Sequence, residues 1–186
     1  MKYFSVTQVL SPFCDFSKIP PDVLEYAATR GTAVHRICLN VYAKGLPTVN
    51  IPDDCFGYFQ SFKMWFDEYV TEVISIEKEY IDRRFGYVGH VDLVCILKDG
   101  RIVIIDLKTP AVESPTWKCQ LAAYRAVVAD DLFHNMDSSL EIPEKNGCLS
   151  LQLKPNGNAA KAIVYQYSDN DFAAFLSALN AYRYFN

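Results

Sequence analysis

The stretch that decides the fold is GHVDLVCILKDGRIVIIDLKT, residues 89–109. Two segments within it, residues 91–97 and 101–107, consist mainly of β-branched and other apolar residues, which is typical of buried strands. The Lys-Asp-Gly sequence at residues 98–100 separates them, and an Asp-Gly pair is typical of the tight turn in a β-hairpin. The sequence therefore predicts two antiparallel strands joined by a short turn, both near the centre of a sheet.

Two carboxylates and one ammonium group belong to these strands. Asp92 lies on the first strand, and Asp106 and Lys108 lie at the end of the second. Side chains alternate along a strand, so Asp106 and Lys108 should point to the same face. A carboxylate among apolar residues is costly to bury unless it is paired or binds a metal. Two oxygen ligands beside an ammonium group suit Mg²⁺ or Mn²⁺ and a phosphodiester. The alternatives are a salt bridge on one face of the sheet and, for Asp92, a solvated edge position.

The order of Asp92, a hairpin and then Asp106-x-Lys108 resembles the PD-(D/E)xK nuclease superfamily. Three further pieces resemble its RecB-type branch, which includes the CRISPR adaptation nucleases. They are RGTAVHRI at residues 30–37, Glu79 on the strand that leads into the hairpin, and QLAAY at residues 120–124. Val91 stands where the superfamily name has proline.

The resemblance implies a restriction-endonuclease-like fold, in which a mixed central β-sheet is flanked by helices. It also implies a role for each residue that matches the motifs. The expected metal ligands are His35, Asp92, Asp106 and the main-chain carbonyl of Leu107, and the expected catalytic residues are Asp92, Asp106, Lys108, Gln120, Tyr124 and Glu79. The expected cofactor is Mg²⁺ or Mn²⁺, and a histidine ligand favours Mn²⁺.

Each of the less central residues also has an ordinary structural interpretation. His35 lies one position away from the apolar face of its predicted helix and could simply be a hydrogen-bonding residue. Glu77 and Glu79 share a face of their strand, and either could be a solvated charge. Gln120 and Tyr124 are four residues apart on a helix and could hold a phosphate or the lysine, but Tyr124 also fits a core stripe.

Length, composition and charge restrict the class of protein. With 186 residues, 51% of them hydrophobic, the chain is expected to form one domain, residues 1–186, with a sizeable core. The formal net charge of −4 argues against binding long duplex DNA through broad electrostatic attraction, so contacts with nucleic acid should be local. The sequence leaves the oligomeric state open.

The six cysteines indicate reduced thiols in an intracellular protein. They lie at positions 14, 38, 55, 95, 119 and 148, without a C-x-x-C pair, and no secretory leader precedes them. A cytoplasmic location is therefore expected, in the host cell if the protein is viral. Some relatives hold an iron–sulfur cluster with closely spaced cysteines near the C-terminus, but only Cys148 lies in the last third here, so no cluster is expected. No apolar run approaches the ~20 residues that span a bilayer, so no membrane partner is expected.

The remaining segments predict an α/β arrangement with a mixed central sheet. An irregular N-terminal arm is expected at residues 1–20 and a loop at 130–146, and either could close over a cleft so that it admits only a DNA end. Helices are expected at residues 21–28, 31–44 (ending before Gly45), 55–70 (capped by Asp53 or Asp54), 115–129 and 169–184, and further strands at 71–82, 148–153 and 162–167.

The function expected from these observations is metal-dependent hydrolysis of DNA, with DNA that has a free end as the partner. Single domains of this branch are often exonucleases in replication, repair or recombination, and many are encoded by phages or other viruses. The alternatives are a catalytically inactive module that binds nucleic acid or protein through the same fold, and a metal-dependent RNase. Exonuclease or endonuclease action, polarity and strand preference stay open at this stage.

Overall fold

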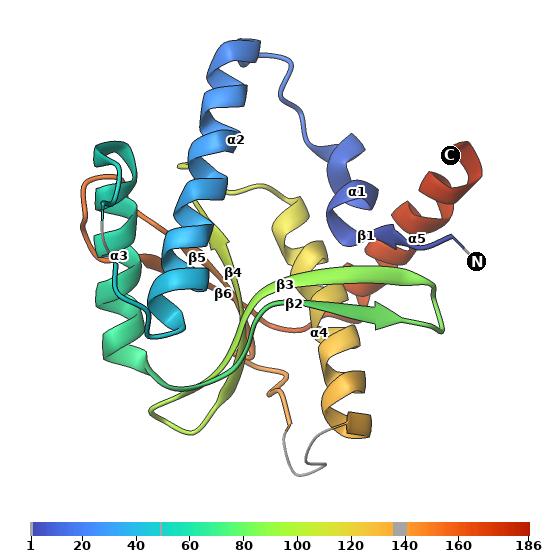
Figure 1. Cartoon of the computed structure of the whole chain (residues 1–186). Helices are drawn as coiled ribbons and strands as arrows, with labels where there is room; N and C mark the ends of the chain where they lie inside the picture. Colours follow the sequence, from blue (N-terminus) through green and yellow to red (C-terminus); the bar gives the residue numbers. More distant parts are fainter. Residues whose placement is uncertain (1, 49, 136–140) are drawn as a thin grey trace.

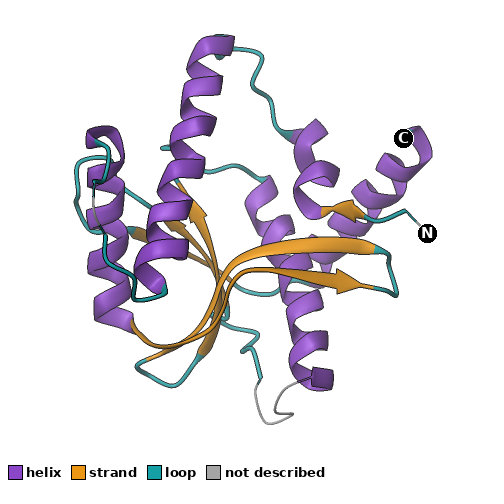
Figure 2. Ribbon diagram, viewed as in Figure 1, coloured by secondary structure: helices purple, strands orange, loops and turns teal. Residues whose placement is uncertain are grey.

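In the residues that the computed structural model describes, 2–48, 50–135 and 141–186, a six-stranded mixed sheet has helices on both faces (Figure 1, Figure 2). The strands are β1 (Phe4–Ser5), β2 (Val70–Asp82), β3 (Tyr87–Leu97), β4 (Ile102–Lys108), β5 (Cys148–Gln152) and β6 (Lys161–Tyr165). The helices are α1 (Val6–Leu10), α2 (Pro21–His35), α3 (Asp53–Tyr69), α4 (Thr116–Asn135) and α5 (Asp169–Phe185), with a 3₁₀ turn at Ser11–Phe13 and a π-helix at Arg36–Ala43. None of the described helices is both long and apolar enough to cross a membrane.

The predicted hairpin forms the centre of this sheet. β3 pairs antiparallel with β2 along one side and with β4 along the other, and β4 continues parallel to β5, which pairs antiparallel with β6. The pairing between β3 and β4 runs from Ile96 with Ile102 to Leu93 with Ile105. Beyond this last pair, β1 lies parallel to the start of β3. Asp92 and Asp106 therefore follow directly where the ladder between β3 and β4 ends.

Two cores cover the two faces of the sheet. Val103, Ile105 and Leu107 pack with α2, the π-helix and α3 on one face. Ile102 and Ile104 pack with α1, α4 and α5 on the other. Because side chains alternate along β4, this arrangement directs Asp106 and Lys108 toward the face that α4 covers.

The expectation of an irregular arm at residues 1–20 was wrong for its first part. Phe4 pairs with Tyr87, and Val6 and Val9 are buried with α4 and α5. Ser5 and Gln8 form a capping box, in which the Ser5 hydroxyl accepts from the Gln8 amide and the Gln8 side chain accepts from the Ser5 amide. The Ser-x-x-Gln pattern of this box was the sequence signal for a helix start. The apolar side chains of residues 4–10 therefore belong to the core, and this segment does not form a cover for a cleft.

Three helix boundaries also differ from the expectation. Residues 21–35 form one helix that continues into the π-helix, because Gly31 lies inside it without a proline to interrupt it. Neither Asp53 nor Asp54 caps α3; both lie in its first turn, after Pro52. α4 continues to Asn135, six residues beyond the expected end, since Leu132 is buried against the same core as Val128. Of the predicted loop at 130–146, residues 136–140 lie outside the described residues.

α3 carries a stripe of aromatic side chains at helical spacing, and most of this stripe belongs to the core. Phe59, Phe62 and Trp65 are buried, whereas Tyr69 at the end of the helix is exposed. The stripe packs in the core on the side of α2 and therefore fixes α3 against the sheet beside the helix that carries His35.

The place of the N-terminal residues in the core can be tested by comparing two neighbouring aromatic side chains. Phe4 is buried and its ring lies 5.1 Å from that of Tyr182, whereas Tyr3 is 41% exposed. We expect Phe4→Ala to lower the free energy of unfolding by about 3 kcal/mol. Tyr3→Ala should change it by about 0.5 kcal/mol or less. Urea denaturation measures both, and equally small effects would contradict the assignment of this segment to the core.

Candidate metal centre

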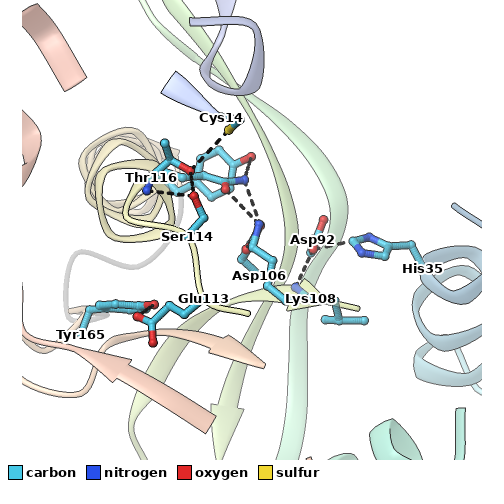
Figure 3. Close-up of polar contacts among 12 residues, drawn as sticks. Cys14, His35, Asp92, Asp106, Lys108, Glu113, Ser114, Thr116 and Tyr165 are labelled. Carbon is cyan, nitrogen blue, oxygen red and sulfur yellow. Dashed lines mark hydrogen bonds and ion pairs between the residues drawn. The ribbon is translucent and has the colours of Figure 1, made fainter. Parts of the chain in front are cut away.

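Asp92 joins a helix and two strands at the point where β3 and β4 separate. Its side chain is nearly buried, and its Oδ2 lies 3.5 Å from Nδ1 of His35, at the end of α2. The same oxygen accepts a hydrogen bond of 2.7 Å from the main-chain amide of Leu107 on β4. Figure 3 shows the imidazole of His35 and the carboxylate of Asp92 pointing toward one another. The pairing between β3 and β4 has ended at this point, so the Asp92 carboxylate accepts the hydrogen bond of the Leu107 amide in place of a backbone carbonyl.

Glu77 lies opposite Asp92 on β2. The pairs Ile76 with Leu93 and Lys78 with Val91 flank these two residues. Glu77 has a φ of 49°, in the left-handed region, which costs a residue other than glycine roughly 1 kcal/mol. Such strain is often kept at functional sites.

His35, Glu77 and Asp92 can together hold a metal ion. Each offers one ligand atom, and these atoms all lie within 4.8 Å of one another. An imidazole nitrogen with two carboxylate oxygens is a donor set that suits a borderline divalent ion such as Mn²⁺ and also admits Mg²⁺. The donor chemistry of the site therefore fits the predicted cofactor.

The charges of His35, Glu77 and Asp92 favour the binding of a cation. Partial burial raises the pKa of Glu77, and the carboxylate of Asp92 raises it further. Burial would also raise the pKa of Asp92, but the charge and hydrogen bond of His35 and the amide of Leu107 outweigh it and lower the pKa. Two neighbouring carboxylates repel one another, and a bound divalent ion would relieve that repulsion.

Asp106, Lys108, Gln120 and Tyr124 form a second, connected cluster on the face that α4 covers. Lys108 Nζ lies 2.6 Å from Asp106 Oδ2 and donates a hydrogen bond of 3.0 Å to Gln120 Oε1. Gln120 Nε2 donates to Asp106 Oδ1 and to the Tyr124 hydroxyl, both at 3.0 Å. The ammonium group also lies 5.3 Å from the ring centre of Trp117. Gln120 therefore holds the lysine and the carboxylate at once.

Burial changes the titration of this second cluster. It raises the pKa of Asp106 to about 6; the positive charge of Lys108 opposes the rise, and the carboxylate of Asp92 adds to it. Burial also raises the pKa of Tyr124 well above its ordinary value. Tyr124 therefore remains a neutral hydroxyl at physiological pH, able to accept from Gln120 and to donate.

The structure brings most of the predicted site residues together. His35 and Asp92 are in contact, as are Asp106, Lys108, Gln120 and Tyr124, and the amide of Leu107 joins the two groups. An N–H and a C=O of one strand residue point to the same side, so the Leu107 carbonyl also faces the side of Asp92. Asp106 faces Lys108 and Gln120, and Glu77 takes the third position in the metal-binding group.

Glu79 lies apart from this group. It pairs with His90 across β2 and β3, its side chain is 54% exposed, and the two side chains are 3.6 Å apart. Its catalytic role stays a prediction, and Glu77 is the better-placed carboxylate. The feature that could have identified Glu77 as the residue opposite Asp92 is the turn at residues 83–86, where Gly86 has a φ of 69°. Counting back from that turn on both strands brings residue 77 opposite residue 92.

The π-helix explains how His35 reaches its position. α2 ends at His35, and the wider helix begins at the next residue. Ile37, Cys38 and Leu39 are all buried, although one face of a regular α-helix does not bury three consecutive residues. The change in helix type allows all three to pack while His35 points toward the sheet; π-helical segments are frequent at functional sites.

The position of Glu77 can be tested against that of Glu79, its neighbour on the same face of β2. We expect Glu77→Gln to weaken Mn²⁺ binding by about tenfold or more, because it removes one charged ligand. Glu79→Gln should leave the affinity unchanged, since its carboxylate contacts His90. Isothermal titration calorimetry measures both variants, and a larger loss for Glu79→Gln would show that the wrong carboxylate has been assigned.

The pH dependence of metal binding follows from His35. Burial would lower the pKa of His35, but the charge and hydrogen bond of Asp92 raise it from 6.5 to about 9. In the metal-free protein the proton on His35 therefore stabilises the fold fully below pH 6.5, and this stabilisation is lost as the pH rises through about 9. A protonated imidazole cannot bind a metal, so binding must release the proton.

We therefore expect the affinity for Mn²⁺ to rise by up to about tenfold per pH unit between roughly pH 7 and 8. Calorimetry in two buffers of different ionisation enthalpy counts the released proton. His35→Gln is the control, because it has no proton to release at this position. An affinity that stays constant over this range in the native protein would exclude His35 as a ligand.

Comparison with known protein families gives a match that includes most of these site residues. Residues 53–182 match the family model described as the PD-(D/E)XK nuclease superfamily. The match includes Glu77, Asp92, Asp106, Lys108 and the cluster on α4, and it begins after His35. A search of curated proteins found no match. The mixed sheet flanked by helices is consistent with the restriction-endonuclease-like fold. The matched region covers more than half of the 186 residues, and the chain therefore belongs to the PD-(D/E)XK nuclease superfamily, whose members are divalent-metal-dependent nucleases.

Proposed function

We propose that the protein is a deoxyribonuclease that requires Mg²⁺ or Mn²⁺. The observation that carries this proposal is the position of the metal-binding group, His35, Glu77 and Asp92, next to a largely buried ion pair between Asp106 and Lys108. The Leu107 amide connects the two parts through Asp92. This combination provides ligands for a cation and a fixed positive charge beside it, which hydrolysis of a phosphodiester needs.

In this proposal each residue of the site has its own role. His35, Glu77 and Asp92 would hold the ion, with Asp106 and the Leu107 carbonyl as the remaining predicted ligands. A bound divalent ion activates a water molecule and stabilises the negative charge of the leaving oxygen. Lys108 offsets the charge that develops on the phosphate, and Gln120 keeps its ammonium group in place. Tyr124 holds Gln120 from the other side.

Within this class we propose an exonuclease of the RecB-type branch that acts on DNA with a free end in replication, repair or recombination. The motifs around His35, Gln120 and Tyr124 support this branch. The formal net charge of −4 supports local contact with a DNA end rather than extended binding along a duplex. The burial of Phe4, Val6, Val9 and Leu10 in the same core as α4 and α5 supports treating residues 1–186 as one nuclease domain.

The proposal is tested by offering four substrates in the presence of Mg²⁺ or Mn²⁺. These are end-labelled single-stranded DNA, linear duplex DNA, closed circular DNA and RNA. We expect loss of the linear DNA substrates, with intact circles and RNA. Lys108→Ala should lower the rate by roughly 100-fold or more, because it removes a fixed charge from the transition state. Lys118→Ala is a matched control, since this lysine pairs with Asp171 away from the site.

Each alternative function has its own outcome in this assay. Degradation of RNA alone would identify an RNase. Binding of DNA without cleavage under all conditions would indicate an inactive binding module of the same fold. Cleavage of closed circles would replace the exonuclease with an endonuclease. Cleavage that persists in Lys108→Ala would reject the role given to Lys108.

A further inference from the structure

We infer that Gln152 is a positioning residue that fixes the segment after Lys108, and thereby the place of the Lys108 ammonium group. This inference rests on the proposed nuclease function. Gln152 is the last residue of β5 and the direct neighbour of Lys108 in the parallel pairing of β4 and β5. Gln152 is 4% exposed, and its pairing with Lys108 places it on the face of the sheet that α4 covers.

The side chain of Gln152 continues the sheet where the backbone cannot. β4 ends at Lys108, whose carbonyl still accepts a hydrogen bond of 2.8 Å from the Leu153 amide. Pro110 follows two residues later and has no N–H, so a regular ladder cannot continue through it. Gln152 Nε2 donates to the carbonyls of Pro110 and Ala111, both at 2.9 Å. One side-chain amide therefore supplies the two donors that these carbonyls need.

The orientation of this amide is determined by its partners. Carbonyl oxygens only accept hydrogen bonds, so the nitrogen of Gln152 must face Pro110 and Ala111. The oxygen Oε1 accepts from Lys154 Nζ at 2.9 Å. All the hydrogen-bonding atoms of the Gln152 amide group thus have partners, and a buried side chain in this state is held in one position.

The segment held in this way connects the two parts of the catalytic cluster. Residues 109–115 run from Lys108 to the start of α4, which carries Gln120. A second contact holds the same segment further along, where the Tyr165 hydroxyl donates to Glu113 Oε1 at 2.8 Å (Figure 3). If the first contact is lost, the Lys108 main chain has fewer constraints, and the distances from its ammonium group to Asp106 and Gln120 are no longer fixed.

The test compares Gln152→Met and Gln152→Glu with the native protein. Methionine keeps the length of the side chain without any donor, and glutamate keeps the acceptor for Lys154 but also lacks donors. We expect kcat on linear DNA to fall by about 10- to 100-fold in both variants, because small displacements of a catalytic group have effects of this size. KM for DNA should change by no more than about twofold, since the contacts that bind substrate in the ground state are kept.

Two further measurements separate positioning from a general loss of structure. Hydrogen exchange at the amides of residues 111–117 should become faster in both variants, because these residues follow the released contact. The affinity for Mn²⁺ should stay the same, since His35, Glu77 and Asp92 belong to α2, β2 and β3. Gln60→Met is the matched control: this glutamine is exposed on α3, and the same substitution there should leave kcat, KM and exchange as in the native protein.

The possible results have distinct meanings. Unchanged kcat and unchanged exchange in both Gln152 variants would overturn the inference. A large loss of thermal stability with equal changes in kcat, KM and metal affinity would also overturn it, because it would show a purely structural role. If the native protein cleaves no nucleic acid, the proposed function fails. Exchange at residues 111–117 then still decides whether Gln152 holds this segment.

Discussion

The arrangement of the site depends on one buried carboxylate at the point where two strands separate. Asp92 lies where the pairing between β3 and β4 ends, and its Oδ2 meets both His35 and the Leu107 amide. An isolated charge in this position would be strongly destabilising, so its partners have to be present for the fold to exist. The same requirement brings α2 to the sheet and leaves an imidazole and a second carboxylate beside Asp92. Stability of the fold and assembly of the candidate metal centre thus have a common cause.

The site consists of two groups with different relations to solvent. His35, Glu77 and Asp92 come from α2, β2 and β3, and Glu77 remains exposed, so a cation can reach the group. Asp106, Lys108 and Gln120 are enclosed between β4 and α4 and are already hydrogen-bonded to one another. The first group is therefore suited to bind and release a metal ion. The second group is suited to keep its geometry while the ion binds. Preorganised charge of this kind needs little rearrangement during a reaction.

The sequence predicted the parts of this architecture that follow from local patterns. The hairpin, its turn at residues 98–100 and the shared face of Asp106 and Lys108 follow from side-chain alternation and turn chemistry, and the structure confirms them. Helix boundaries were less accurate where packing outweighed local signals, as at Gly31 within α2 and at Leu132 near the end of α4. The choice between Glu77 and Glu79 depended on the register of β2 against β3, which is set by a turn at residues 83–86 rather than by the strands themselves. Gln152 was not predicted, because its partners, the carbonyls of Pro110 and Ala111, lie 42 and 41 positions earlier in the chain.

The packing of the first residues against the last helix has a consequence for how this molecule is made. Phe4 contacts Tyr182 through their rings and Tyr87 through the strand pairing, so its partners are separated from it by much of the chain. During synthesis the N-terminal segment cannot be buried until Tyr87 and Tyr182 have both been made. Contacts between such distant positions require large loops to close, which slows folding. The central hairpin, whose partners are neighbours in the chain, is therefore the natural place for structure to begin, and the two ends of the polypeptide join it late.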